Sequence, residues 1–331
     1  MIEIENVYKG KRVLIAGGSG FVGANLINKL LSLGADVRAT IHKKQPVIID
    51  ERIEYVKCDL LKMSDCRKVV RDMDYVFMCA ANTSGAAVIA SNPLVHVTPN
   101  IIMNSQILEA SYFAGVKKFV FISSNAAYPP TGNRPVREDE MFDGDPYETY
   151  YGVGWMKRYT EILCSMYSQK LKNPMITVVI RPSNIYGPLD DYDFATSHVM
   201  AAMIRKVAER HNPIIMWGDG NDIRDLIYID DFIDAVILAA EKVNTYDPIN
   251  IGAGIGNRLI EILQMIMKTD NYNDAVIKYD TSKPSMIPVR LIDIAKVEKT
   301  IGFSPKIGLR EGIGRTLQWY REKYDPASQR Q

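Results

Sequence analysis

The glycine-rich stretch AGGSGFVG, which begins at Ala16, contains the residues that most directly indicate a chemistry. Its Gly17, Gly20 and Gly23 follow an apolar run and open a segment whose apolar residues recur at helical spacing. Glycine at such positions permits a tight turn and close approach of the backbone to a ligand, and the first N–H groups of the following helix can bind a pyrophosphate. The stretch therefore predicts a dinucleotide-binding loop. A tight strand-to-helix connection without a ligand is the alternative.

The residues after the second expected strand bear on which dinucleotide would bind. A carboxylate at the end of that strand would accept hydrogen bonds from the ribose hydroxyls of NAD. The strand VRATI is followed instead by His42, Lys43 and Lys44, and basic groups suit the 2′-phosphate of NADP. This favours NADP over NAD, with a solvated basic turn as the alternative. Asp59, after the third expected strand, is expected either near the adenine or as a cap of the next helix.

The elements that must hold this loop alternate between short β-branched runs and amphipathic segments. Strands are expected at 12–17, 35–41, 75–81, 118–124 and from 176, and helices at 20–33 and around 101–108. Such alternation requires parallel crossover connections, so we predict an α/β fold with a Rossmann-type doubly wound parallel sheet. A smaller α/β C-terminal lobe is expected to bind the substrate. The predicted boundaries are 1–184 with 223–250 for the dinucleotide-binding domain, and 185–222 with 251–331 for this lobe.

The composition excludes several broad classes of function. The 331 residues include 40 Lys and Arg against 39 Asp and Glu, so no overall field would attract nucleic acid or an anionic membrane. The four cysteines fit neither a zinc pattern nor a disulfide framework, and buried, reduced thiols are expected. The charged beginning of the sequence and the lack of a long apolar run predict neither a signal peptide nor a membrane span. We therefore expect a cytoplasmic protein.

Several motifs, in the same order along the chain, resemble the extended short-chain dehydrogenase/reductase superfamily and, within it, the nucleotide-sugar epimerase/dehydratase family. AGGSGFVG resembles the cofactor loop, and FISSNAAYP resembles the strand that carries the active-site Ser or Thr, here Ser124. RPSNIYGP resembles the segment between the nicotinamide and the sugar. WGDGNDIRDLIYIDD and PSMIPVRLIDIAK resemble two segments that each supply a diphosphate-binding arginine, here Arg224 and Arg290. The resemblance covers nearly the whole chain.

Within this family the likeness is strongest to the GDP-L-fucose synthases. The stretch NIYGPLDDYDFATSHVMAAMI resembles one that contains a Ser-His pair in those enzymes, which implies an acid/base role for His198. A structural histidine is the alternative on the residues alone. The resemblance also implies that Asn184 helps to position the substrate phosphates. The residues expected at the cofactor are Gly17, Gly20, Phe21, Val22, Gly23, His42, Lys43, Asp59, Leu60, Ala80, Lys157 and Pro182.

The stretch YYGVGWMK, which ends at Lys157, departs from the family pattern. The family uses a Tyr-x-x-x-Lys pair on one helical face, where the lysine lowers the pKa of the tyrosine and binds the nicotinamide ribose. Counted from Ser124, Lys157 stands at the position of the lysine and Val153 at that of the tyrosine. The proton-transferring group of the family is therefore missing from its usual place.

Three interpretations of this departure remain open. Tyr151 or Tyr150 could reach the site if the chain near Gly152 and Gly154 is not helical. His198 or a carboxylate could transfer the proton instead, with Ser124 assisting. The fold could also bind a nucleotide without any redox chemistry.

The sequence as a whole predicts an NAD(P)-dependent nucleotide-sugar epimerase, dehydratase or reductase that transfers a hydride at a sugar carbon. Its expected catalytic residues are Ser124, Tyr151, Lys157 and His198. Ala126 stands where close relatives have a second epimerisation residue, and Ser124 to Ala126 lacks the Thr-Asp-Glu triplet of 4,6-dehydratases. The family implies a homodimer through the helices containing 100–114 and 157–170. The competing prediction is a non-catalytic NADP-binding regulator or scaffold, which would not need two diphosphate arginines.

Overall fold

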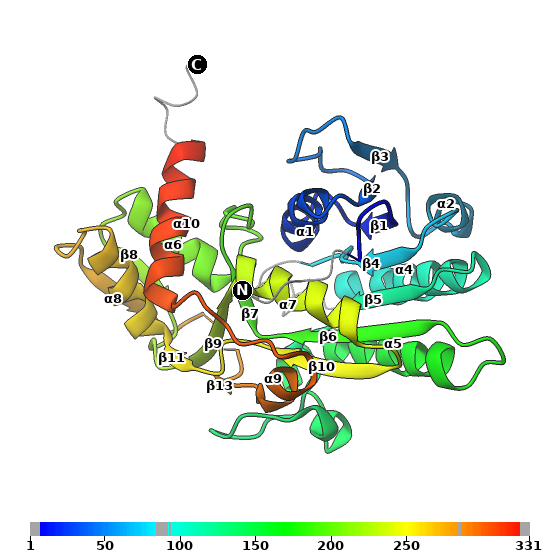
Figure 1. Cartoon of the computed structure of the whole chain (residues 1–331). Coiled ribbons are helices and arrows are strands. Elements are labelled where there is room, and N and C mark those ends of the chain that lie inside the picture. The colour runs from blue at the N-terminus through cyan, green and yellow to red at the C-terminus, as the bar shows by residue number, and fades with distance from the viewer. Residues whose placement is uncertain (1–6, 84–91, 93, 284–285, 325–331) are drawn as a thin grey trace.

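A parallel seven-stranded sheet forms the larger part of the computed structural model, which describes residues 7–83, 92, 94–283 and 286–324 (Figure 1). The strand order is β10-β6-β5-β4-β1-β2-β3, and every neighbouring pair is parallel. The strands are β1 (Arg12–Ala16), β2 (Asp36–Ile41), β3 (Ile53–Lys57), β4 (Tyr75–Met78), β5 (Lys118–Ile122), β6 (Ile176–Pro182) and β10 (Asp247–Ile251). The predicted Rossmann-type sheet is confirmed.

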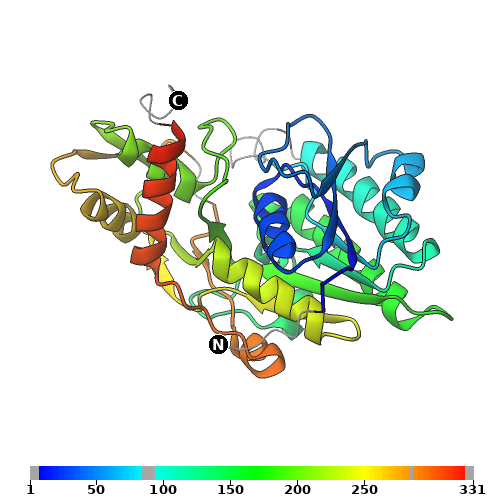
Figure 2. The ribbon, with the colours of Figure 1, turned by 45° about the horizontal axis from the view of Figure 1, so that its top comes forward.

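Helices cover both faces of this sheet, because successive side chains of each buried strand point to opposite faces (Figures 1 and 2). Val13 and Ile15 of β1 pack in the same core as α1 (Phe21–Ser32) and α7 (Ile229–Lys242). Leu14 and Ala16 pack in the opposite core with the helices α2 (Met63–Val69), α4 (Leu94–Phe113) and α5 (Tyr151–Gln169). The cysteines are unpaired, and three of the four are buried.

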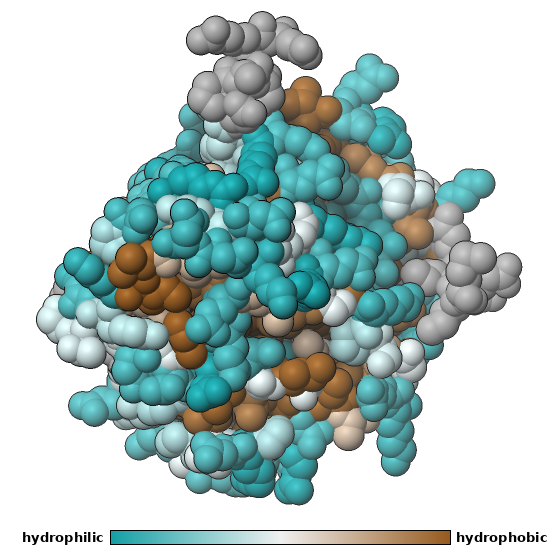
Figure 3. Space-filling view, turned by 90° about the vertical axis from the view of Figure 1, so that its left-hand side faces the viewer, coloured by the Kyte–Doolittle hydropathy of each residue, from teal (hydrophilic) through white to brown (hydrophobic). Residues whose placement is uncertain are grey.

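A second, smaller part contains two further sheets and lies at the left in Figure 1. One sheet joins β7 (Asn184–Tyr186), β9 (Ile223–Tyr228), β11 (Gly256–Arg258) and β13 (Val289–Arg290), and the other joins β8 (Ile214–Trp217) and β12 (Ile277–Asp280). The helices of this part are α6 (Val199–Ala208), α8 (Leu259–Thr269) and α10 (Leu309–Tyr324). Figure 3 views it from outside, where hydrophilic side chains cover most of the surface and separate the apolar ones.

Two segments differ from their expected places. The residues after β6, expected as a loop, contain the short strand β7, which pairs with β9. Residues 223–228 were expected in the first domain, but β9 pairs with strands of the smaller sheet, and only α7 and β10 return to the large one. The helix α9 (Ala295–Ile301) packs beside β10. In the described part of the chain, no helix is both long and apolar enough to cross a membrane.

Candidate active site

The glycine loop follows β1 directly and turns into α1. Gly17 has a positive φ of 92°, and a Cβ there would lie 2.7 Å from the backbone of Ala80. A Cβ on Gly23 would lie 2.2 Å from the carbonyl oxygen of Gly17, so the loop itself requires both glycines. Gly20 differs, because a Cβ there would meet only the Gly17 carbonyl oxygen, at 3.3 Å. The space beside Gly20 is therefore not filled by any residue that the structure describes.

The beginning of α1 fits a bound pyrophosphate. Gly20 is the N-cap residue and offers no side chain to accept a hydrogen bond, and the first turn contains no acidic residue. The first N–H groups of a helix lack intrahelical partners and, with the helix dipole, favour a phosphate group; those of Phe21 and Val22 belong to this turn. Thr40 anchors the loop, since its hydroxyl oxygen accepts a hydrogen bond from the N–H of Gly17 at 2.8 Å. These features fit a dinucleotide cofactor.

The basic turn after β2 lies against this loop. The hydroxyl of Ser19 donates a hydrogen bond to the backbone oxygen of Lys44 at 3.1 Å, and His42, Lys43 and Lys44 are all exposed. Lys44 also forms a 3.6 Å ion pair with Asp191. β2 ends at Ile41, so no carboxylate occupies the position that would bind the ribose hydroxyls of NAD. The arrangement fits a 2′-phosphate.

The other residues expected around the cofactor lie at the ends of neighbouring strands. Asp59 accepts a hydrogen bond from the N–H of Leu61 at 3.1 Å and stabilises the turn before α2, but the N-cap residue of that helix is Lys62, so Asp59 does not cap it. The side chain of Leu60 is buried in the core. Ala80 follows β4 and packs against Gly17, and Pro182 is the last residue of β6.

Ser124 and Lys157 meet at the carboxyl end of β5. Ser124 caps the short 3₁₀ helix η1 (Asn125–Ala127), and its hydroxyl oxygen accepts a hydrogen bond from the N–H of Ala126 at 3.1 Å. The ammonium group of Lys157 donates to the carbonyl oxygen of Ile122 at 2.7 Å and lies 4.7 Å from the ring centroid of Phe121. Burial lowers the pKa of Lys157 to about 8, although Glu161 acts in the opposite direction. A cation is thus held at the carboxyl end of β5, two residues before Ser124.

A buried polar network supports this end of β5 from behind. Glu161 of α5 is fully buried and pairs with Arg181 of β6 at 2.6 Å, and the hydroxyl of Ser123 donates to the same carboxylate. Arg181 also donates to the hydroxyl of Tyr128 at 2.7 Å, and that hydroxyl donates to Asn250 at 2.6 Å. The hydroxyl of Tyr128 therefore already has both of its partners within the network, and burial raises the pKa of Tyr128. Neither Glu161 nor Arg181 was predicted, and only Arg181, a charged residue within the apolar strand β6, gave a signal in the sequence.

The residue at which α5 begins determines the directions of the Tyr150 and Tyr151 side chains. Tyr151 is the first helical residue, and Gly152 to Gly154 are helical too, so the expected nonhelical start is wrong. The Tyr151 side chain is 53% exposed, and its ring lies 6.5 Å from that of Trp155 on the outer face of the helix. Tyr151 therefore does not face the site. Val153 is half-buried and precedes Lys157 by one helical turn.

Tyr150 points the other way. It is the N-cap residue of α5 and is half-buried. Burial raises the pKa of Tyr150, and the positive charges of Arg224 and Arg290 act against this rise. The phenol therefore belongs to the surroundings of the two arginines.

Arg224 and Arg290 are paired residues of the neighbouring strands β9 and β13, and both are buried. Arg224 forms a 3.0 Å ion pair with Asp222. Within the described part of the chain, Arg290 donates to the carbonyl oxygens of Tyr128, at 3.3 Å, and Pro129, at 3.2 Å, and its buried Nε has no partner there. Burial lowers the pKa of Arg290 to about 10, and no described carboxylate pairs with it. Two buried guanidinium groups with one carboxylate between them form a site for an anion.

The remaining two expected residues lie at the beginnings of β7 and α6. Asn184 is the first residue of β7 and pairs with Leu226 of β9. His198 is the N-cap residue of α6, and its side chain is exposed. Loss of hydration among the surrounding protein atoms nevertheless lowers the pKa of His198, and Asp191 acts in the opposite direction.

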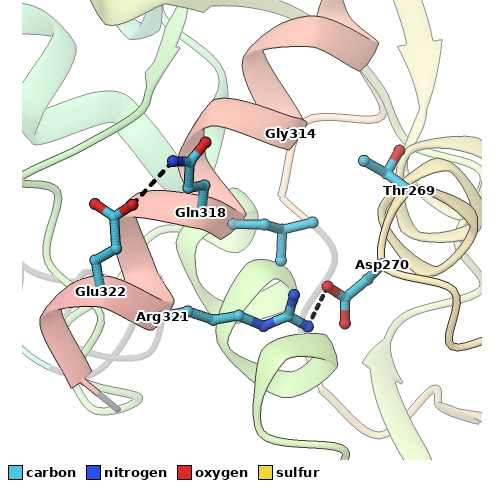
Figure 4. Close-up of a pocket in the computed structure, with 7 residues that line it drawn as sticks. Thr269, Asp270, Gly314, Gln318, Arg321 and Glu322 are labelled. Atoms are coloured by element: carbon cyan, nitrogen blue, oxygen red, sulfur yellow. Dashed lines mark hydrogen bonds and ion pairs between the residues drawn. The ribbon is translucent and has the colours of Figure 1, made fainter. Parts of the chain in front are cut away.

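A hollow between α8 and α10 is a weaker candidate (Figure 4). Its charged side chains already have partners, because Asp270 pairs with Arg321, and Gln318 donates to Glu322 at 2.9 Å. None of the residues that line it belongs to the glycine loop, the end of β5 or the arginine pair. Among the described residues, no group of His, Cys, Asp and Glu could hold a metal ion.

The parallel sheet and its glycine loop are those of a Rossmann-type dinucleotide-binding fold. The buried arginine pair belongs to the smaller sheet beside it. The chain belongs to the NAD dependent epimerase/dehydratase family, whose sequence model matches residues 13–252. Members of this family include NAD(P)-dependent epimerases, dehydratases and reductases acting on nucleotide sugars. The family expected from the motifs is confirmed.

Individual relatives cover nearly the whole chain. It is 28% identical to the GDP-L-fucose synthase of Sinorhizobium fredii (strain NBRC 101917 / NGR234) over 93% of this chain and 95% of the relative. It is 26% identical to the probable GDP-L-fucose synthase 1 of Oryza sativa subsp. japonica, over 95% and 93%. Among solved structures, the UDP-glucose 4-epimerase of Thermotoga maritima with UDP-glucose superposes with a TM-score of 0.85 at 25% identity, covering 95% of this chain and 100% of that one. The expected likeness to GDP-L-fucose synthases is confirmed.

Proposed function

We propose that the protein is an NADP-dependent enzyme that transfers a hydride at a sugar carbon of a nucleoside-diphosphate sugar. The observation that carries this proposal is the buried pair Arg224 and Arg290, in which Arg290 has an unpartnered Nε and no carboxylate partner among the described residues. A buried cation without a counter-charge is costly unless a ligand supplies one. Guanidinium groups suit phosphate because they bind it in a bidentate manner.

We favour a diphosphate over a single phosphate because three groups, the guanidinium groups of Arg224 and Arg290 and the phenol of Tyr150, lie near one another and together offer more donors than one phosphate needs. The solved relative from Thermotoga maritima contains UDP-glucose, whose nucleotide carries such a diphosphate. In this proposal Asn184, at the start of β7, contacts the phosphates as well.

The cofactor side supports a nicotinamide dinucleotide. The N–H groups at the start of α1 would hold its pyrophosphate, and His42 and Lys43 would bind the 2′-phosphate of NADP, assisted by Lys44. When bound, such a cofactor exchanges a hydride with a carbon of the substrate. Lys157 would hold the nicotinamide ribose, and the hydroxyl of Ser124 would donate a hydrogen bond to the reacting sugar oxygen, since its own oxygen accepts from Ala126.

The two residues that follow Ser124 bear on which type of reaction the protein catalyses. Ala126 provides no second proton-transferring group, and Asn125 and Ala126 replace the acidic pair of 4,6-dehydratases. Reduction of a keto sugar, or the reverse oxidation, needs fewer groups than either epimerisation at two carbons or dehydration. We therefore favour a single hydride transfer.

The exposed apolar side chains of α5 support a homodimer. Tyr151, Trp155, Tyr159, Ile162 and Met166 recur at intervals of three or four residues, which places them on one exposed face of the helix. α4 packs beside α5 and adds exposed Ile102 and Phe113. A continuous apolar stripe of this kind favours pairing with the same stripe of a second copy. Tyr151 belongs to this stripe in our proposal.

The proposal is tested with a panel of GDP-, UDP-, CDP- and dTDP-sugars, including 4-keto forms, with NADPH and NADH. Absorbance at the nicotinamide band would follow the hydride, and Arg290→Met is the variant that should lose the substrate. Turnover of one sugar nucleotide, with weaker binding in that variant, would support the proposal. Tight binding of a nucleotide without any hydride transfer would instead support the non-catalytic regulator or scaffold.

A further inference from the structure

His96, near the beginning of α4, is a buried imidazole that the proposed mechanism has not used. Its side chain is 3% exposed, and its Nδ1 lies 3.0 Å from the carbonyl oxygen of Asn82. A carbonyl oxygen only accepts, so Nδ1 must carry the hydrogen, and Nε2 of the neutral ring then carries a lone pair. This Nε2 is buried, and no described residue forms a hydrogen bond with it. A buried acceptor without a donor is costly in a folded protein, and it indicates that a ligand or substrate group completes it.

The position of Nδ1 is fixed by a local network. Asn82 follows β4, and its carbonyl oxygen also accepts a hydrogen bond from the side chain of Asn100 at 3.0 Å. The N–H of Asn82 donates to the Asn100 side-chain oxygen at 2.8 Å, and the side chain of Asn82 donates to the carbonyl oxygen of Val95 at 2.9 Å. His96 is therefore tied to the carboxyl end of β4, the strand beside β5 with its Ser124 and Lys157.

Helix packing brings the beginning of α4, which contains His96, beside the beginning of α5. A Cβ on Gly152 would lie 3.0 Å from Cγ2 of Val97, and further along the two helices Asn104 donates to Thr160 at 3.2 Å. α4 and α5 thus run in the same direction, and the residue before Val97 lies beside the first turn of α5. That turn contains Val153, whose side chain cannot transfer a proton.

We propose that His96 is the group that exchanges the proton with the reacting sugar oxygen in place of the missing tyrosine. The inference rests on the proposed function. In the oxidative direction, the C–H and O–H bonds of one sugar carbon break and a C=O bond forms. The hydride goes to an oxidised nicotinamide dinucleotide and the proton goes to Nε2 of His96. In the reductive direction both transfers are reversed, and the imidazolium donates the proton.

The variant His96→Asn separates a structural role from this one. An asparagine amide can take the place of Nδ1 and still donate to the carbonyl oxygen of Asn82, whereas it has nothing at the position of Nε2. We expect kcat to fall by about 10²–10⁴-fold, the usual contribution of a proton-transferring side chain, with little change in KM and in the thermal midpoint. His211→Asn is the matched control, because His211 is exposed and pairs with Glu209 on the surface.

A measurement on wild-type protein keeps the test independent of turnover. In ¹⁵N-histidine-labelled protein, which contains four histidines, the resonances absent from His96→Asn belong to His96. We expect the Nδ1–H tautomer in the free protein and a shift of the Nε2 resonance when NADP⁺ and the turned-over sugar nucleotide are added. An Nε2–H tautomer or an unmoved resonance would overturn the inference.

The outcomes distinguish this inference from the proposed function. If wild-type protein transfers hydride and His96→Asn does so at the same rate, His96 has no catalytic role. A severe loss in His198→Asn or Tyr150→Phe with a silent His96→Asn would assign the proton to that residue instead. If wild-type protein transfers no hydride to any sugar nucleotide, the proposed function fails and this role fails with it.

Discussion

Replacing Arg290 by methionine should weaken nucleotide binding, while its two effects on the stability of the free protein largely offset each other. Burial lowers the pKa of Arg290 from 12.5 to about 10, which at about 1.36 kcal/mol for each pH unit corresponds to a cost of about 3 kcal/mol for holding the charge. Methionine has a similar length and removes this cost. The buried carbonyl oxygens of Tyr128 and Pro129 then lose their donors, which costs about 1–3 kcal/mol each. In the free protein the two effects therefore largely offset each other, and the balance lies between about 1 kcal/mol in favour of the variant and about 3 kcal/mol against it.

Binding should suffer at the same time. A hydrogen bond to a charged group contributes about 1.5–3 kcal/mol, so we expect Arg290→Met to bind a nucleoside diphosphate about 10–150-fold more weakly. Thermal unfolding with and without UDP or GDP measures both effects in one experiment. The free variant should unfold within several degrees of wild type, and it should lose most of the stabilisation by nucleotide.

The matched control is Arg315→Met on α10, whose guanidinium is exposed and paired with Glu311. It should leave both the free midpoint and the nucleotide effect nearly unchanged. The reasoning is refuted if free Arg290→Met unfolds several degrees below wild type while nucleotide stabilises it as much as wild type. Such a result would make Arg290 a structural cation that only braces the backbone at Tyr128 and Pro129.

Four further predictions address the rest of the site. Gly20→Val should abolish NADPH binding and leave folding intact, whereas Gly23→Val should prevent folding, as a fluorescence titration and circular dichroism would show. Replacing Lys43 and Lys44 together by alanine should weaken NADPH more than NADH; equal weakening would assign NAD as the cofactor. The folded-state pKa of Lys157, about 8, lies below its ordinary 10.5, so the unfolded chain binds more protons between these values. The stability of wild type relative to Lys157→Met should therefore rise over this pH range, by up to about 3 kcal/mol in denaturant titrations. Ile162→Glu on the exposed stripe of α5 should convert a dimer into monomers in sedimentation, and an unchanged mass would exclude this interface.

The parts of the fold that the sequence predicted are those with local causes. The glycine loop could be recognised because Gly17 and Gly23 are required by backbone conformation and close contact, independently of the rest of the chain. The alternation of strands and helices followed from runs of β-branched residues and from helical spacing of apolar ones. The pairing of β9 with the smaller sheet could not be predicted in the same way, because apolar strands of either sheet have the same pattern.

Residues of the candidate site could be predicted only where a sequence motif contains them at a fixed position. Ser124 follows β5 and Lys157 donates to the last residue of that strand, so both lie at the end of β5, and their catalytic roles stay predictions. Tyr151 failed because the direction of a side chain near a helix start depends on the residue at which the helix begins, and sequence patterns place such boundaries only to within a few residues. His96 could not be singled out, since its importance lies in an unpartnered Nε2 that is visible only after Asn82 has been brought to Nδ1 by the fold.

The position of Lys157 also explains how the family tyrosine could be lost without losing the cofactor. In this chain the ammonium group is held by the carbonyl oxygen of Ile122, not by the residue one turn earlier. Valine at 153 therefore removes a proton-transferring group but leaves the cation that would bind the ribose in place. Binding of the cofactor by Lys157 therefore does not require a proton-transferring residue one helical turn earlier. A histidine on the neighbouring helix α4, held at its Nδ1 and without a described partner at its buried Nε2, is the group that we propose to transfer this proton instead.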